Sequence, residues 1–271
     1  MNTRAPKKAV ILARGLGSRM RAASDAELTE EQQRAASAGV KAMISVGRPF
    51  LDHVMSAMAD AGFTDICLVI GPEHQMIRDY YDNLETSRVN ISYAVQEEPL
   101  GTADAVLAAE EFAGDDPILV VNSDNYYPAG SLAKLANATG SAVLGFDREG
   151  LIAKANIPRE RIAAFAILDV DEDGNMIDIV EKPTAADMER LGEDALISMN
   201  AWMFTPKIFE AAKNIELSPR GELELQSAVR AAIADGEAFA VLPTDDGVMD
   251  LSSRDDIKAV AEVFEGRPVS L

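Results

Sequence analysis

Short apolar runs alternate with stretches of helical spacing over the first half of the chain. The runs are rich in β-branched residues, and most are bounded by Gly, Pro, Asp or Asn. They cover residues 10–12, 66–70, 91–95, 118–121 and 142–145. Between them, residues 49–61 stop at Gly62 and place Phe50, Val54 and Met58 four apart, and residues 102–112 repeat Ala and Leu at helical spacing. This alternation predicts βαβ units and an α/β fold with a doubly wound, mostly parallel sheet.

The second half has a different pattern. Residues 162–170 and 176–180 have the composition of strands and flank the turn Asp171-Glu172-Asp173-Gly174, which predicts an antiparallel hairpin inserted into the fold. Further helices are expected at 184–191, 206–213, 222–234 and 254–264, and further strands at 197–204 and 238–242. Residues 24–39, rich in Ala, Glu and Gln, predict a helix where an α/β fold normally has a short loop, so we expect an insertion over 21–39.

Charge narrows the classes of partner. The 271 residues include 25 Lys and Arg against 45 Asp and Glu, a formal net charge of −20, so we expect neither nucleic acid nor an anionic membrane surface as a partner. The basic N-terminus is followed by an apolar run over 9–13 only, too short for a signal peptide, and no later run approaches a membrane span. Cys67, the only cysteine, excludes an intrachain disulfide and agrees with a cytoplasmic protein.

A glycine-rich segment directly follows the first predicted strand. It reads Leu12-Ala13-Arg14-Gly15-Leu16-Gly17-Ser18-Arg19-Met20. Two glycines let the backbone approach a ligand, consecutive N–H groups can surround a phosphate, and Arg19 offers a planar cation to the phosphate oxygens. The segment is neither a P-loop nor a dinucleotide fingerprint, because Met20 stands where the third Gly should be. Taken alone, it fits a triphosphate cradle and a plain strand-to-helix turn alike.

Two polar residues further along can extend such a site. Lys41 lies before an apolar stretch and a helix opened by Pro49, where it can face phosphates, although a lone lysine is usually a solvated charge. Gln96 ends a predicted strand shortly before Gly101, and its amide can donate and accept together at the edge of a base.

The ordered set of short motifs carries more information than any one of them. It comprises Gly15-Leu16-Gly17-Ser18-Arg19-Met20, Lys41 with Gly47-Arg48-Pro49, Gln96 with Leu100-Gly101-Thr102-Ala103, Ser123-Asp124-Asn125, Glu181-Lys182-Pro183, Arg220-Gly221-Glu222-Leu223 and Asp250. In this order the chain resembles the sugar-1-phosphate nucleotidyltransferase family, the sugar-nucleotide pyrophosphorylases, and in particular the glucose-1-phosphate uridylyl- and thymidylyltransferases. The resemblance covers essentially the whole chain.

The resemblance implies a Rossmann-like fold of the nucleotide-diphospho-sugar transferase type, forming a single domain over residues 1–271. It implies a nucleotide-binding part over roughly 1–150, a sugar-binding part with the antiparallel insertion over roughly 151–250, and a C-terminal helix over 253–266. Because the chain reaches Leu271 soon after that helix, we expect no appended domain. Homo-oligomers are common in the family and are an expectation here too.

The resemblance also assigns roles to single residues. Those implied for nucleotide binding are Ala13, Gly15, Gly17, Ser18, Gln96, Gly101 and Thr102. The cations implied for catalysis are Arg19, Lys41 and Lys182, and the two carboxylates implied for Mg²⁺ are Asp124 and Asp250. Mg²⁺ prefers hard oxygen ligands and usually takes only one or two from protein. The residues implied for the sugar phosphate are Ala166, Glu181, Lys182, Asn200 and Arg220.

The activity implied is transfer of a nucleotidyl group from a nucleoside triphosphate, UTP or dTTP being favoured, to a sugar 1-phosphate, with release of pyrophosphate. Two alternatives stay open: a cytidylyltransferase acting on a polyol phosphate or a cofactor precursor, and a catalytically weak regulatory subunit that binds sugar phosphates. One departure from the family pattern stands inside the site, since Arg14 occupies a position where relatives have Gly or Ala. Its guanidinium can add a contact to the nucleotide or obstruct it.

Overall fold

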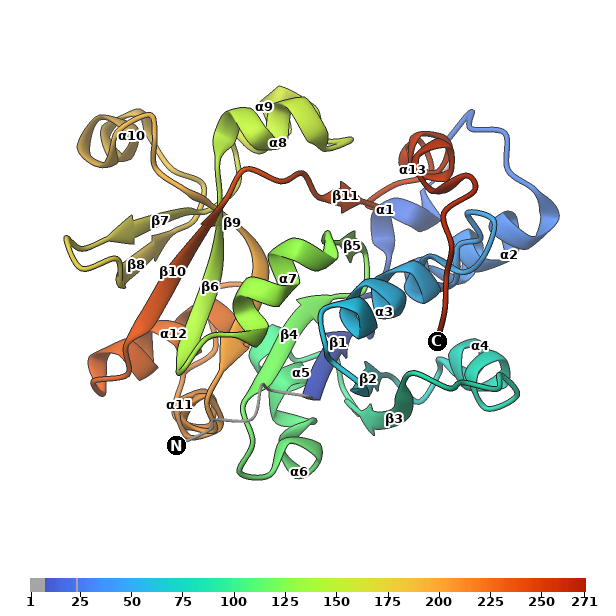
Figure 1. Cartoon of the computed structure of the whole chain (residues 1–271), viewed down its shortest axis with the longest axis horizontal. Helices are drawn as coiled ribbons and strands as arrows, with labels where there is room; N and C mark the ends of the chain where they lie inside the picture. The colour runs from blue at the N-terminus through green and yellow to red at the C-terminus, as the bar shows by residue number, and fades with distance from the viewer. Residues whose placement is uncertain (1–7, 23) are drawn as a thin grey trace.

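The computed structural model describes residues 8–22 and 24–271 (Figure 1). Residues 1–7, with most of the basic N-terminal segment, lie outside the described part. Within it, the main sheet has nine strands, seven of them in the order β10-β6-β9-β4-β1-β2-β3. These seven are β1 (Lys8–Leu12), β2 (Asp65–Ile70), β3 (Asn90–Val95), β4 (Ile118–Asn122), β6 (Ser141–Phe146), β9 (Ile197–Phe204) and β10 (Phe239–Thr244).

Most of these strands run parallel, as the apolar pattern predicts. β1 pairs in parallel with β2 and β4, β2 with β3, and β6 with β10. Only β9 opposes its neighbours on this path, lying antiparallel between β4 and β6. From β1 the chain fills one side of the sheet with β2 and β3 and then returns to place β4 on the other side of β1. The carboxyl ends of β1 and β4 therefore meet where the strand order reverses, the usual ligand position in such sheets.

Helices cover both faces of the sheet, which confirms the doubly wound prediction. Along β2, Ile66 and Leu68 join the hydrophobic core on one face, and Cys67 joins the core on the other. The first core includes side chains of α3 (Phe50–Asp60) and α7 (Ala129–Ala136), and the second includes side chains of α5 (Thr102–Leu107), α11 (Lys207–Lys213) and α12 (Leu225–Ala234). Figure 1 shows α3 and α7 in front of the central strands. Burial of strands on both faces explains their nearly continuous apolar runs.

The remaining helices follow the predicted alternation in most places. They are α1 (Ser18–Arg21), α2 (Glu30–Ala38), the 3₁₀ turn η1 (Lys41–Met43), α4 (Gln75–Tyr81), α5 (Thr102–Leu107), α6 (Glu110–Ala113), α8 (Arg148–Lys154), α9 (Arg159–Ile162), α10 (Ala185–Leu191), α11 (Lys207–Lys213), α12 (Leu225–Ala234) and α13 (Asp256–Phe264). The expected single helix over 102–112 is wrong, because the chain breaks at Ala109 (φ −94°, ψ 7°) between α5 and α6. α5 packs against α11 and α12. Ala and Leu favour a helix, but helix preference is a weak guide that tertiary packing often overrides.

The antiparallel insertion is shorter than predicted. β7 (Ile167–Val170) and β8 (Met176–Val180) form the hairpin, and β7 also meets β9. The expectation of one strand over 162–170 is wrong at its start, where Pro158 opens α9 instead of a strand. The turn is confirmed: Gly174 adopts φ 83°, and the Asp171 carboxylate accepts the backbone N–H groups of Asp173 and Asn175.

The expected insertion over 21–39 holds a helix in its second part only. In α2, Thr29 and Gln32 form a capping box, and Gly39 ends the helix with φ 77°. Arg254 joins this insertion to the C-terminal part of the chain, donating to the carbonyl of Met20 and to the side chain of Gln33. The insertion is therefore packed onto the body of the fold beside the glycine-rich segment.

Candidate active site

The loop after β1 carries the glycine-rich segment over the carboxyl edge of the sheet. Ala13 still donates its backbone N–H to the carbonyl of Val69 at 2.8 Å, which extends the β1–β2 ladder before the chain turns. Gly17 then adopts φ 59°, and a Cβ there would lie 2.2 Å from the carbonyl oxygen of Gly39. Gly17 is therefore needed both for the left-handed turn and for the close packing of this loop against the end of α2.

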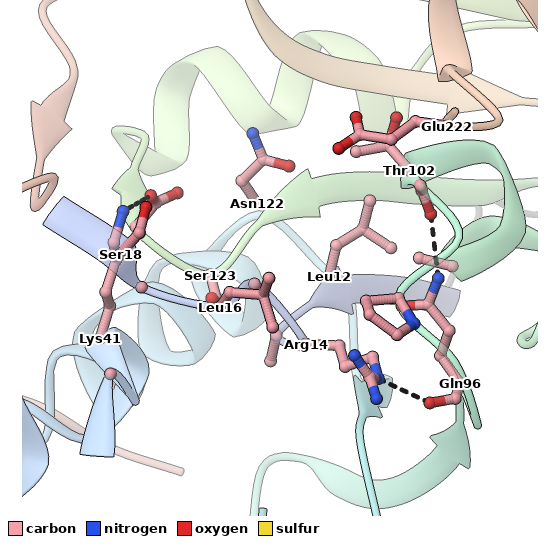
Figure 2. Close-up of a pocket in the computed structure, with 18 residues that line it drawn as sticks. Leu12, Arg14, Leu16, Ser18, Lys41, Gln96, Thr102, Asn122, Ser123 and Glu222 are labelled. Carbon is pink, nitrogen blue, oxygen red and sulfur yellow. Dashed lines mark hydrogen bonds and ion pairs between the residues drawn. The ribbon is translucent and has the colours of Figure 1, made fainter. Parts of the chain in front are cut away.

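The glycine-rich segment forms one wall of a cavity (Figure 2). The residues predicted for nucleotide binding all line it: Ala13, Gly15, Gly17, Ser18, Gln96, Gly101 and Thr102. Lys41 and Asp124 line it as well. In Figure 2, Lys41 lies at one end of the cavity, and Arg14 and Gln96 lie at the other. The fold thus gathers these predicted residues around one space, which we call the nucleotide cavity after the predicted ligand.

The end of the cavity near Gln96 is held by side-chain hydrogen bonds. The Gln96 amide nitrogen donates to the carbonyl of Gly101 at 3.0 Å and to the carboxylate of Asp104 at 2.8 Å. Gly101 has φ 125° and ψ 178°, a conformation that is almost exclusive to glycine. Leu223 packs against it, since a Cβ on Gly101 would lie 2.4 Å from the Leu223 carbonyl oxygen. This contact brings the loop that holds Glu222 to the rim of the nucleotide cavity.

At the other end, Lys41 and Asp124 form an ion pair. The distance from Lys41 Nζ to Asp124 Oδ2 is 2.8 Å, and both side chains are partly buried. Lys41 belongs to η1, which follows the insertion, and Asp124 lies just past β4. The insertion therefore does not keep Lys41 away from the glycine-rich loop. Lys41 and Asp124 are 83 positions apart in the sequence and meet at the carboxyl edge of the sheet.

Asp250 is brought beside Asp124 by a small second sheet. β11 (Met249–Asp250) pairs antiparallel with β5 (Asn125–Tyr126), and Leu251 donates its backbone N–H to the carbonyl of Asp124 at 2.8 Å. One oxygen of the Asp250 carboxylate accepts from Arg161 at 2.9 Å, and the other accepts from Asn125 at 3.1 Å. The carboxylate is thus held in a fixed orientation.

The two carboxylates fit the demands of a hard divalent cation. Asp124 and Asp250 line one cavity together with Arg19 and supply oxygen donors from adjacent backbone segments. Within residues 8–22 and 24–271 no group of three or more His, Cys, Asp or Glu side chains is placed to hold a metal. Beneath them, burial and then the charges of Asp124 and Asp250 raise the pKa of Tyr127 well above its usual range.

Three cavities adjoin along the edge of the sheet, and Asn122 lines all of them. The first is the nucleotide cavity, the second holds Arg19, Asp124 and Asp250, and the third holds Glu181 and Arg220. Asn200 lines the second and the third. Arg19 thus faces the carboxylate cavity rather than the one that the nucleotide residues line.

The residues predicted for the sugar phosphate divide into two groups. Glu181, Asn200 and Arg220 share the third cavity, where Arg220 donates to the Glu224 carboxylate at 2.8 Å. That hydrogen bond and the charge of Glu224 raise the pKa of Arg220. Ala166 and Lys182 line none of these three cavities. Ala166 packs against the core and accepts a hydrogen bond from the Ser198 backbone, and the Lys182 side chain is exposed.

Backbone conformation nevertheless singles out Lys182. Within the described residues, the non-glycine residues with positive φ are Lys182, at 49°, and Asn200, at 58°. Asn adopts the left-handed region more readily than most residues because its short polar side chain can hydrogen-bond to the nearby backbone, whereas the Lys side chain offers no such compensation. Such conformations cluster at functional sites, and both of these residues were predicted for the sugar phosphate.

Sequence reasoning did not find several residues that line these cavities. Arg161 and Phe165 line the cavity of Arg19, and both were expected in or next to a strand. Pro158 followed by charged residues is the signal of a helix start that would have placed Arg161 in a short helix. Asn122 carries no motif of its own, and its position at the end of β4 is the only signal that could have identified it.

Within the described part of the chain, no helix combines the length and the apolar character needed to cross a membrane.

Comparison with known proteins identifies relatives over most of the chain. It is 31% identical over 234 residues to the low-salt glycan biosynthesis nucleotidyltransferase Agl11 of Haloferax volcanii, covering 86% of this chain and 58% of that protein. It is 31% identical over 232 residues to a glucose-1-phosphate thymidylyltransferase of Streptomyces antibioticus, covering 84% and 58%. The chain therefore spans about three fifths of the length of these two relatives.

A third relative matches over nearly its full length. The UTP–glucose-1-phosphate uridylyltransferase AglF of Haloferax volcanii is 28% identical over 254 residues, which cover 92% of this chain and 93% of that protein. Among solved structures, a UDP-glucose pyrophosphorylase complexed with UDP-glucose superposes with a TM-score of 0.74 at 18% identity, covering 97% of this chain and 100% of that one, which supports the fold. A sequence model described as nucleotidyl transferase matches residues 8–262. The chain belongs to the nucleotidyl transferase family.

Proposed function

We propose that this protein transfers a nucleotidyl group from a nucleoside triphosphate to a sugar 1-phosphate and releases pyrophosphate. The observation that carries the proposal is the set of three adjoining cavities at the switch point of the sheet, with Asn122 common to all three. The glycine-rich loop lines the first cavity, Glu181 and Arg220 line the third, and Asp124 lines the first and the second. Two phosphorylated substrates bound in the first and third cavities would meet near Asn122.

The reaction needs no covalent enzyme intermediate. An anionic oxygen of the sugar phosphate attacks the α-phosphorus and forms a new P–O bond, while the bond from the α-phosphorus to the β-phosphate oxygen breaks. The electron pair leaves with pyrophosphate. Because the attacking phosphate is already ionised near neutral pH, a general base is unnecessary. The protein has to orient two polyanions and balance the charge that develops between them.

We assign that electrostatic role to Arg19, Lys41 and Lys182. Lys41 is paired with Asp124 at 2.8 Å on the wall of the nucleotide cavity, within reach of a bound phosphate tail. Arg19 lines the neighbouring cavity. Lys182 is exposed beside Glu181, and its strained backbone supports a role at the sugar phosphate.

We propose Mg²⁺ as the cofactor, held by Asp124 and Asp250. When bound, it would neutralise phosphate charge and help to align the α-phosphate. The chain's own contribution is to hold the two carboxylates: Arg161 and Asn125 orient Asp250, and the β5–β11 pairing keeps it beside Asp124.

We propose UTP or dTTP as the nucleotide, since relatives are named as uridylyl- and thymidylyltransferases. The sugar-binding part would lie in residues 151–250 and the nucleotide-binding part in residues 1–150. We propose a cytoplasmic location, in keeping with the single cysteine, Cys67, which is buried and can form no intrachain disulfide.

The test is pyrophosphate release from a panel of nucleoside triphosphates and sugar 1-phosphates in the presence of Mg²⁺. Asp124→Asn should lower turnover by about 100-fold or more, as expected for loss of a preorganised group that stabilises charge. The matched control is Asp116→Asn, because Asp116 lies just before the opposite end of the same strand and is largely exposed, in an ion pair with Lys8.

The control should retain wild-type turnover. Full Mg²⁺-dependent activity in Asp124→Asn would contradict the metal assignment, and no release from any substrate pair would contradict the proposed activity. Tight binding of sugar phosphates without any release would favour the regulatory alternative. Release with CTP and a polyol phosphate, but not with sugar 1-phosphates, would favour the cytidylyltransferase.

A further inference from the structure

Arg14 is buried at the base end of the nucleotide cavity, with only 8% of its surface exposed. Its Nε donates to the carbonyl of Gln96 at 2.7 Å and its Nη2 donates to the carbonyl of Glu97 at 3.1 Å. These two atoms form one edge of the planar guanidinium, so its plane is fixed against the end of β3. Figure 2 shows Arg14 and Gln96 side by side on the cavity wall.

One corner of this guanidinium has no partner. Nη1 is shielded from water and makes no hydrogen bond within residues 8–22 and 24–271. The only acidic side chain paired with Arg14 there is Glu73, whose carboxylate lies 3.5 Å from Nη2 and is half exposed. A buried donor of a charged group is costly to leave unpaired, so an acceptor supplied by a ligand would be favourable.

Gln96 offers the complementary group. Its amide nitrogen is occupied by two acceptors, the carbonyl of Gly101 and the carboxylate of Asp104, neither of which can donate. This fixes the orientation of the amide, so the nitrogen faces these acceptors and the oxygen Oε1 faces away from them. Within the described part of the chain, Oε1 accepts no hydrogen bond. The same cavity is thus lined by Arg14, whose Nη1 lacks a partner among the described residues, and by Gln96, whose Oε1 accepts no hydrogen bond from them.

We propose that Arg14 determines base specificity: a bound base displaces the atoms that cover Nη1, which then donates to a ring carbonyl oxygen while Gln96 Oε1 accepts from the adjacent ring N–H. This inference rests on the proposed function. Uracil and thymine present O4 beside N3–H, and guanine presents O6 beside N1–H. Cytosine and adenine present an amino donor beside a ring nitrogen acceptor, so each contact would become donor to donor or acceptor to acceptor. The site would therefore select bases with a carbonyl next to a ring N–H and reject amino bases.

A purely structural role for Arg14 is the competing interpretation, because its two backbone contacts also connect the loop after β1 to the end of β3. The two roles differ in what a substitution changes. A structural contact affects stability and all nucleotides equally, whereas a contact to the base changes the ratio between nucleotides.

The experiment measures binding of UTP, dTTP, GTP, CTP and ATP to the full chain by equilibrium dialysis with Mg²⁺, and kcat/KM for pyrophosphate release with the same nucleotides. The decisive comparison is UTP with CTP, which differ only at ring position 4 and in the protonation of N3. Arg14→Ala should lower the UTP-to-CTP ratio by about 10- to 100-fold, the effect of one lost contact to a buried charged donor. Arg14→Lys keeps the charge without the planar fork and should lower it similarly.

The matched control is Arg88→Ala. Arg88 also donates to a backbone carbonyl, that of Ser270 at 3.2 Å, but it lies outside the nucleotide cavity, so its loss should leave the ratio unchanged. A wild-type protein that binds CTP as well as UTP would overturn the inference, as would an unchanged ratio in a folded Arg14 variant. If neither variant folds, the wild type decides: 4-thio-UTP, with a weaker acceptor at position 4, must bind several-fold more weakly than UTP, and equal binding overturns the inference.

The two proposals fail separately. Pyrophosphate release without a dependence of the base ratio on Arg14 would leave the proposed function in place and remove only this inference. Absence of release from every substrate pair would remove the proposed function, while the dialysis ratios would still measure the base preference directly.

Discussion

Replacing Gly101 with alanine tests how the nucleotide cavity is joined to the loop that holds Arg220 and Glu222. Gly101 has φ 125° and ψ 178°, and an added Cβ would lie 2.4 Å from the carbonyl oxygen and 2.7 Å from the nitrogen of Leu223. Two backbone hydrogen bonds converge on Leu223: Ala103 donates to its carbonyl at 2.9 Å, and its own N–H donates to Leu100 at 2.7 Å. The methyl group cannot fit unless these segments separate.

The magnitude follows from two contributions. Placing a residue with a side chain in this backbone region costs about 1–3 kcal/mol. Loss of the two hydrogen bonds adds about 1 kcal/mol each. Gly192→Ala provides the matched control, because Gly192 has a similar backbone conformation (φ 86°, ψ 160°) but nothing within 4 Å of its added Cβ. The control should lose only the first contribution.

The assay is urea denaturation at neutral pH, followed by the fluorescence of Trp202. We expect Gly101→Ala to be less stable than Gly192→Ala by about 2 kcal/mol, which corresponds to a midpoint lower by roughly 0.7 M for a slope of about 3 kcal/mol/M. Equal losses in the two variants would refute the reasoning, because they would show that the approach of Leu223 to Gly101 carries no stability.

Three further predictions concern other parts of the molecule. Burial lowers the pKa values of His53 and His74, the only two histidines, in the folded state. As the pH falls, these histidines therefore bind protons in the unfolded chain before they do so in the folded one. The free energy of unfolding should fall as pH drops below about 6.5. Urea midpoints at pH 7.5 and 5.5 check this, and an equal dependence in a His53→Gln/His74→Asn variant would contradict it. Trp202, the only tryptophan, is fully buried and lines the cavity of Glu181 and Arg220, so binding of a sugar 1-phosphate should change its fluorescence emission saturably. Arg220→Ala should weaken that binding about fivefold or more. An unchanged dissociation constant would argue against Arg220 as a ligand. Lys182→Ala should leave the free energy of unfolding within about 0.5 kcal/mol of the wild type because the side chain is exposed, while raising KM for the sugar phosphate. An unchanged KM would remove Lys182 from the site.

The sequence predicts those parts of the fold in which a local pattern and the tertiary environment agree. The strands expected at 176–180 and 197–204 are β8 and β9 with the same bounds. The apolar side chains of β9 are buried, and in β8 Met176 and Ile179 are buried as well. The break at Ala109 and the helix over Arg159–Ile162 were not predicted, because local helix preference does not record where tertiary packing interrupts or starts a helix.

The candidate site was predictable in the same uneven way. The glycine-rich loop, Gln96 and Asp124 follow strands directly, so a parallel sheet necessarily brings them to one edge. Arg161 was missed because its contact with Asp250 joins residues 89 positions apart, and no local pattern records such a pairing. The composition of β9 likewise gave no sign of its direction, which is antiparallel to both of its neighbours, β4 and β6.

The pairing of β11 with β5 has a consequence for the order in which the protein is made. Asn125 and Asp250 touch across 125 positions, so during synthesis the ribosome must add almost all of the described chain before the second carboxylate can join the first. A nascent chain that already holds the glycine-rich loop, Lys41 and Asp124 would therefore still lack half of its acidic pair. Translation arrested before β11 would yield a product with a nucleotide pocket and an incomplete centre.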